Sequence, residues 1–166
     1  MSADISILEV LTPREIEAVQ KLFLRYREGL WQACQLPDSE WQGLPGPYDP
    51  PSGGLLLAVS DGRPAGCVGL RPFPQMGTCE MKRLFVSPEF RGQRLGEMLI
   101  TAVIRLARER GYQRMRLDTH PATMGTAVTL YRRFGFRDVD AAPLKSSSQL
   151  AYMELVLNDA QPGRAM

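Results

Sequence analysis

The segment CEMKRLFVSPEFRGQRLGEML, residues 79–99, decides how this chain folds. Its first eight residues predict a β-strand, which Ser87-Pro88 ends. A loop with two glycines and two arginines follows, and apolar residues at helical spacing begin at Leu95. Because a helix N-terminus carries unpaired N–H groups and a partial positive charge, a glycine-rich turn there can hold a phosphate. The segment is therefore either a phosphate-binding turn or a plain surface loop in front of a helix.

Helices and strands are predicted on both sides of this segment. A strand over 5–10 precedes a helix over 12–30, in which Thr12 is the expected N-cap and Pro13 the first helical residue. Asp61-Gly62 is a strong hairpin signal. The other predicted elements are strands over 55–59, 64–70, 114–118 and 150–157, and helices over 95–110 and 124–135. This order predicts a three-layer α/β domain, with a central mixed, mostly antiparallel sheet flanked by helices.

The composition indicates one soluble domain. The chain has 166 residues, 44% of them hydrophobic and 23% charged, and we expect a domain over 1–158 with a frayed tail over 159–166. A net charge of +2 is too small to predict binding to nucleic acid or to an anionic membrane. No apolar stretch approaches the roughly 20 residues of a membrane span. The sequence shows no signal-peptide pattern, and its three cysteines have no paired spacing. We therefore expect the protein to reside in a reducing cytoplasm. The single histidine, His120, predicts no metal site.

The arginines are concentrated in the second half of the chain. Seven of them are Arg105, Arg108, Arg110, Arg114, Arg116, Arg132 and Arg133. They form either solvated helix faces or a rim that attracts a polyanionic cofactor. The glycine-rich loop is not a P-loop, because it lacks Gly-Lys-Ser/Thr, and it lacks the GxGxxG pattern of dinucleotide-binding folds.

Several motifs in the same order resemble the GNAT family of N-acetyltransferases. Residues 79–99 are followed by LDT at 117–119 and by TLYRRFGF at 129–136. Small bacterial-type members also share LPGPYDPP at 44–51 and a strand like YMELVL at 152–157. This resemblance implies acetyl-CoA as the acyl donor, and it favours the phosphate-binding interpretation of the loop.

In that family, a turn after the fourth strand binds the pyrophosphate of acetyl-CoA through backbone N–H groups. The turn here would consist of Arg91, Gly92, Gln93, Arg94, Leu95 and Gly96. Arg94 stands where the family usually has a glycine, so its side chain either crowds the phosphate or adds a charge-assisted contact. The resemblance also implies that the backbone of Leu84, Phe85 and Val86 binds the pantetheine arm along a splayed strand edge. Met124 stands where many members carry an asparagine, so its cofactor contact would be apolar or through the backbone.

Two residues match the positions from which family members supply acid–base catalysis. Glu80 would be the general base that removes a proton from the attacking amine, and an apolar setting would have to raise its pKa from about 4.3. Alternatively, Glu80 is a strand carboxylate paired with Lys82, Arg83 or a neighbour in the sheet. Tyr131 would protonate the departing thiolate. Alternatively, Tyr131 is a structural aromatic residue that packs the short helix.

The acceptor site is the least visible in the sequence. Trp31, Trp41 and Tyr48 lie in a long loop and could line a pocket for the amine. Arg71 is either a surface arginine or a contact for a substrate carboxylate. The segment AAPLKSSSQ at 141–149 differs from that of similar family members, so their substrates are a weak guide to the substrate of this chain. Alternatively, this segment is a mobile lid.

The leading hypothesis is an acetyl-CoA-dependent N-acetyltransferase that moves an acetyl group directly to a primary amine of a small molecule or peptide. Pairing of two copies through edge strands is left open. The alternative is a non-catalytic CoA-binding or interaction module on the same fold, which would bind CoA but release no thiol with any amine. A third interpretation is transfer of a longer acyl group, which depends on the depth of the pocket near the sulfur.

Overall fold

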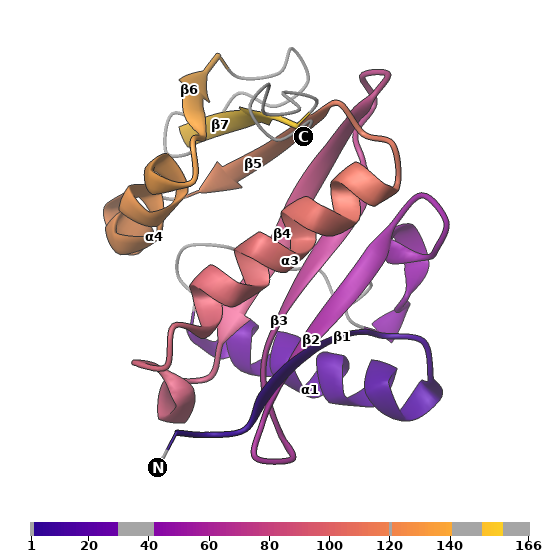
Figure 1. Ribbon diagram of the computed structural model, residues 1–166, viewed down its shortest axis with the longest axis vertical. Helices are drawn as coiled ribbons and strands as arrows, with labels where there is room; N and C mark the ends of the chain where they lie inside the picture. The colour runs from indigo at the N-terminus through magenta and orange to yellow at the C-terminus, as the bar shows by residue number, and fades with distance from the viewer. Residues whose placement is uncertain (1, 30–41, 120, 141–150, 158–166) are drawn as a thin grey trace, which may run out of the picture.

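The computed structural model describes residues 2–29, 42–119, 121–140 and 151–157. These residues form a seven-stranded sheet with helices on both faces (Figure 1). In chain order, the elements are β1 (Ile5–Glu9), α1 (Pro13–Gly29), the 3₁₀ turn η1 (Gly46–Tyr48), β2 (Gly54–Ser60), β3 (Arg63–Pro72), β4 (Thr78–Val86), the 3₁₀ turn η2 (Pro88–Phe90), α3 (Leu95–Glu109), β5 (Arg114–Thr119), α4 (Pro121–Arg133), β6 (Arg137–Val139) and β7 (Ala151–Val156).

Helix α1 begins where its sequence signals predict. Pro13 is its first residue, and the Thr12 hydroxyl accepts a hydrogen bond from the Glu15 N–H at 3.2 Å. In return, the Glu15 carboxylate accepts hydrogen bonds from the N–H groups of Leu11 and Thr12, both at 2.9 Å. This capping box satisfies donors that a helix N-terminus otherwise leaves unpaired. The same backbone hydrogen bonds, from Leu11 first and then Thr12, lower the pKa of Glu15.

The strand order β1-β2-β3-β4-β5-β7-β6 confirms the predicted mixed sheet. Strands β4 and β5 pair in parallel, and the other neighbouring strands of the described sheet pair antiparallel. The β2–β3 hairpin turns at Asp61 and Gly62, whose positive φ angles of 49° and 78° are those of a type I′ turn. Strand β6, which has three residues, was not predicted from the sequence.

Two apolar clusters join the sheet to its helices. On one face, α3 packs Leu99, Ile100 and Val103 against sheet residues such as Leu70 and Met115. On the opposite face, α1 packs its own apolar residues against β2 and β3. In Figure 1, α3 crosses one face of the sheet and α1 lies on the other. The protein is therefore a three-layer α/β domain.

Strands β4 and β5 start side by side and then separate (Figure 1). Their ladder consists of the pairs Thr78↔Arg114, Cys79↔Met115 and Glu80↔Arg116. Beyond Glu80, β4 continues to pair with β3, but an irregularity interrupts that register near Arg83, which has a positive φ of 58°. A bulge bends a strand and increases its local twist. The second half of β4 therefore presents a backbone edge that has no ladder with β5.

Candidate functional site

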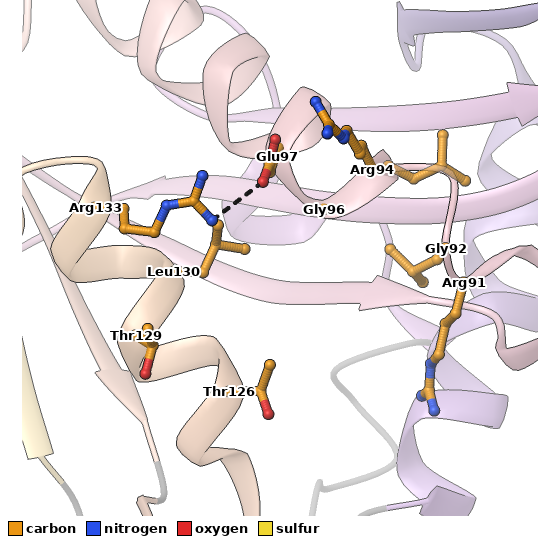
Figure 2. Close-up of a pocket in the computed structure, with 11 residues that line it drawn as sticks. Arg91, Gly92, Arg94, Gly96, Glu97, Thr126, Thr129, Leu130 and Arg133 are labelled. Carbon is orange, nitrogen blue, oxygen red and sulfur yellow. Dashed lines mark ion pairs between the residues drawn. The ribbon is translucent and has the colours of Figure 1, made fainter.

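A groove of about 710 Å³ lies between the start of α3 and helix α4 (Figure 2). We call it the α3–α4 groove. It is lined by Val86, Arg91, Gly92, Arg94, Leu95, Gly96, Glu97, Thr126, Thr129, Leu130 and Arg133. The glycine-rich turn forms one wall, and four residues of α4 form the other. The groove therefore brings together two segments about thirty residues apart in the sequence.

The turn leaves the first N–H groups of α3 without a side-chain cap. Arg94 is the N-cap residue, with φ 62° and ψ 26°, and its side chain makes no capping hydrogen bond. That left-handed conformation is more favourable for glycine, which explains physically why a glycine suits this position. Gly92, with φ 90°, gives the turn its other left-handed residue. The N-terminal amides and dipole of α3 thus favour an anion at this end of the groove.

The charges around the groove are mainly positive. Arg91, Arg94 and Arg133 all line it, and Arg133 lies 3.4 Å from the Glu97 carboxylate. Figure 2 shows this ion pair across the groove, from α4 to the start of α3. Because both partners of the pair are substantially exposed, it contributes little stability and leaves the arginine accessible. A polyanion with an apolar segment fits this combination of arginines with Val86, Leu95 and Leu130.

A second, small cavity of about 30 Å³ lies where β4 and β5 separate. We call it the β4–β5 cavity. Its lining residues are Met81, Lys82, Arg83, Leu84, Leu117, Asp118, Thr119 and Tyr131. Tyr131 is 4% exposed, and its ring packs edge-on against Phe136 with centroids 5.9 Å apart. The predicted acid therefore lies at the gap in the sheet.

Beside this cavity, four side chains form a charged network on β3, β4 and β5: Arg71, Glu80, Lys82 and Asp118. Arg71 Nε donates to the Glu80 carboxylate at 2.9 Å, and Lys82 Nζ lies 3.7 Å from the other Glu80 oxygen. Lys82 Nζ also lies 3.0 Å from both Asp118 oxygens. Glu80 and Lys82 are less than 10% exposed. The immediate partners of Glu80 are thus cations, whereas the hypothesis that Glu80 is the general base required an apolar setting.

The structure brings most of the predicted cofactor residues to these two cavities. Val86, Arg91, Gly92, Arg94, Leu95 and Gly96 line the α3–α4 groove, and Leu84 lines the β4–β5 cavity. The Gln93 side chain instead accepts a hydrogen bond from the Ser60 hydroxyl at 3.0 Å. Phe85 packs with the cluster on the α1 face. The side chain of Met124 lies outside the described residues.

Of the residues predicted to line the acceptor site, the structure describes Tyr48 and Arg71. Tyr48 is 1% exposed and packs edge-on against Phe23 of α1, so the expectation that it lines an open pocket was wrong. Arg71 is 19% exposed and bonded to Glu80, so it is not a solvated surface arginine. Trp31, Trp41, the segment 141–149 and the expected tail over 159–166 lie outside the described residues.

Sequence reasoning missed several residues of both cavities. Thr126, Thr129 and Leu130 line the α3–α4 groove from α4, at the helical spacing that places them on one face. Lys82 and Asp118 reach the β4–β5 cavity from neighbouring strands. Strand alternation places Glu80 and Lys82 on one face, but only the family resemblance, which implied a splayed edge at Leu84, Phe85 and Val86, indicated that the strand beside β4 separates from it.

Two cysteines are buried and unreactive. Burial raises the pKa of the Cys67 thiol far above its usual range, and chiefly burial raises that of Cys79 to about 12. Neither is therefore available as a thiolate nucleophile at neutral pH. In the parts of the chain that the structure describes, we find no helix with the length and apolar character needed to cross a membrane.

Comparison with known proteins gives a consistent result. The model of the acetyltransferase (GNAT) family matches residues 16–136. An uncharacterized N-acetyltransferase of Schizosaccharomyces pombe is 35% identical over 159 residues, which span 94% of this chain and 97% of that protein.

Solved structures show the same fold. An acetyltransferase of the GNAT family from Staphylococcus aureus has a TM-score of 0.79 at 19% identity, covering 93% of this chain and 99% of that one. The PaiA N-acetyltransferase from Thermoplasma acidophilum, solved in complex with coenzyme A, has a TM-score of 0.69 at 16% identity, covering 92% and 99% of the two chains.

Proposed function

The chain belongs to the acetyltransferase (GNAT) family and is an N-acetyltransferase; from this premise we propose that it transfers an acetyl group directly from acetyl-CoA to a primary amine of a small molecule or peptide. The observation that carries the proposal is the pairing of an uncapped, arginine-lined helix N-terminus with a cavity at the gap between β4 and β5. The first suits a CoA pyrophosphate, and the second suits the acyl group.

The residues of the turn would bind the donor. Backbone N–H groups from Arg91 to Gly96 would hold the pyrophosphate, because the first turn of α3 has no side-chain cap. Arg94 and Arg133 would add charge-assisted contacts from the two walls of the groove. The PaiA N-acetyltransferase from Thermoplasma acidophilum, which has the same fold, was solved in complex with coenzyme A, and this supports coenzyme A as the ligand class.

The edge of β4 beyond Glu80 would bind the pantetheine arm. Leu84, Phe85 and Val86 have no ladder with β5, so an extended amide-containing chain would lie along this edge. Val86 lines the α3–α4 groove and Leu84 lines the β4–β5 cavity. An arm along this edge would therefore connect the two cavities.

Acetyl transfer needs a proton removed from the amine and a proton given to the thiolate. We assign the first role to Glu80, acting through water, and the second to Tyr131, which lines the β4–β5 cavity. As the C–N bond forms and the C–S bond breaks, the amine proton passes through water to the Glu80 carboxylate, and the Tyr131 phenol protonates the sulfur. Arg71 and Lys82 hold Glu80 in place.

The test is acetyl transfer to a panel of primary amines, followed by thiol release and by the mass of the product. The proposal expects thiol release that depends on the amine and matches the N-acetylated product. Binding of CoA with no thiol release across amino acids, polyamines and peptide amines would contradict catalysis and favour a CoA-binding module.

A further inference from the structure

Thr119, the last residue of β5, has a buried hydroxyl that forms no hydrogen bond with any described residue. The residue is 4% exposed, and its Oγ1 has no partner among the described residues. A buried hydroxyl without a partner costs about 1–3 kcal/mol. Such groups in native structures call for an explanation, and a ligand that completes the hydrogen bond is one.

Thr119 is one of the residues that line the β4–β5 cavity, together with Tyr131 and Leu84. Strand alternation places Thr119 on the face of Met115 and Leu117, which belong to the cluster around α3, whereas Asp118 faces the charged network. Thr119 therefore approaches the gap from the side on which the α3–α4 groove lies.

No hydrogen bond within the described residues uses this hydroxyl. The backbone of Thr119 is already paired with Ala151 of β7, so β5 is held by its ladder. Asp118 and Tyr131, which carry possible acceptors, also line the cavity, but neither accepts a hydrogen bond from Thr119 Oγ1. The lining residues Met81, Leu84 and Leu117 are apolar. A polar atom that enters the cavity would satisfy the hydroxyl.

We propose that Thr119 is a further catalytic residue, whose hydroxyl donates a hydrogen bond to the carbonyl oxygen of the acetyl thioester. This inference rests on the proposed function. A carbonyl oxygen is a stronger acceptor than a thioester sulfur, and the sulfur is already assigned to Tyr131. As the amine attacks, the C=O group becomes a C–O⁻ group and the hydrogen bond strengthens. When the C–S bond breaks, the carbonyl reforms, and Thr119 keeps its proton throughout.

Two substitutions test this role. Thr119→Val keeps the branched shape and removes the hydroxyl, so stability should stay the same or rise, because no hydrogen bond of the described fold is lost. Loss of one oxyanion donor lowers kcat by about 10²–10³-fold in known cases, and we expect a fall of about 10- to 1000-fold with little change in KM for acetyl-CoA. Thr119→Ser should restore most of kcat.

Each contrary result overturns the inference. An unchanged kcat in Thr119→Val would show that the hydroxyl is not used. A rise in KM alone would place the contact on another part of the cofactor. A clear loss of stability with proportionate loss of activity would assign the hydroxyl a structural partner.

An infrared measurement separates this inference from the proposed function, because it needs no acceptor amine. Acetyl-CoA labelled with ¹³C at the carbonyl is bound to the wild type and to Thr119→Val, and the C=O stretching band is compared. A hydrogen bond lowers this frequency, so we expect the band at higher frequency in the variant. Identical frequencies would overturn the role of Thr119 alone. Failure of the wild type to bind acetyl-CoA would overturn both proposals.

Discussion

Replacing Glu80 with glutamine removes one negative charge from the charged network and keeps the shape of the side chain. In the wild type, the carboxylate accepts a hydrogen bond from Arg71 Nε at 2.9 Å and lies 3.7 Å from Lys82 Nζ. A hydrogen bond to a charged group contributes about 1.5–3 kcal/mol. We expect a loss near the lower end of that range, because Arg71 is 19% exposed and Lys82 keeps Asp118 as its partner.

The effect on activity should be larger than the effect on folding. A positioned general base contributes about 10²–10⁴-fold to the rate, so kcat/KM of Glu80→Gln should fall by about that factor. The free energy of unfolding is measured in urea, and kcat/KM is measured at one pH for both proteins.

Glu9→Gln is the matched control. Glu9 lies on β1 and lines neither cavity, and its carboxylate lies 2.6 Å from Arg110 Nη2 in an ion pair whose side chains are 28% and 14% exposed. The control should lose a comparable amount of stability and keep its activity. If Glu80→Gln behaved like Glu9→Gln, with stability reduced and kcat/KM unchanged, Glu80 would be a structural carboxylate and our assignment of the base would be wrong.

Three further changes test other parts of the account. Tyr131→Phe keeps the ring against Phe136 and should lose only about 1 kcal/mol of stability, but its kcat should fall by about 10²–10⁴-fold; equal kcat values would remove Tyr131 from the chemistry. The β4–β5 cavity of about 30 Å³ is small, so kcat/KM should decrease from acetyl-CoA to propionyl-CoA to butyryl-CoA, and a preference for butyryl-CoA would contradict the assignment of this cavity. The folded-state pKa of Glu15 is lowered by its backbone hydrogen bonds, so its contribution to stability is present above the ordinary value of 4.5 and disappears as pH falls through the lowered pKa. Thermal unfolding of Glu15→Gln should therefore depend less on acid pH than that of the wild type, and parallel curves would show that the capping box is not titrating.

Local sequence signals predicted the elements well. The cap of α1 depends on Thr12 and Glu15, three residues apart, and the β2–β3 hairpin depends on Asp61-Gly62. Both are interactions between near neighbours, so their residue types identify them directly. Strand β6 was missed because three residues are too few for a periodic pattern, and β7 supplies its pairing.

The features that the sequence could not predict depend on packing between distant residues. An aromatic residue in a loop rich in proline and glycine suggested a binding site, but Tyr48 is buried. A Cβ on Gly69 would lie 2.6 Å from the Tyr48 ring, so the absence of a side chain on β3 makes room for it. Likewise, the pairing of Lys82 with Asp118 depends on how β4 and β5 diverge, which the alternation within either strand does not specify.

One part of the candidate site was predictable from neighbouring residues, and the other part depends on tertiary packing. The turn over 91–96 was recognised from residues next to one another, and all but Gln93 line the α3–α4 groove. The opposite wall, on α4, comes from the packing of a later helix. The place of Thr119 in the β4–β5 cavity also follows from the tertiary structure.

The most direct test of the central claim is a calorimetric titration of acetyl-CoA into the wild type, Gly96→Trp and Thr101→Trp. Gly96 lines the α3–α4 groove, whereas Thr101 lies on the exposed face of the same helix and controls for the bulk of the new side chain. We expect the wild type and Thr101→Trp to bind acetyl-CoA and Gly96→Trp to lose binding while remaining folded. Absence of binding by the wild type, or equal binding by all three proteins, would contradict the assignment of the groove to the donor.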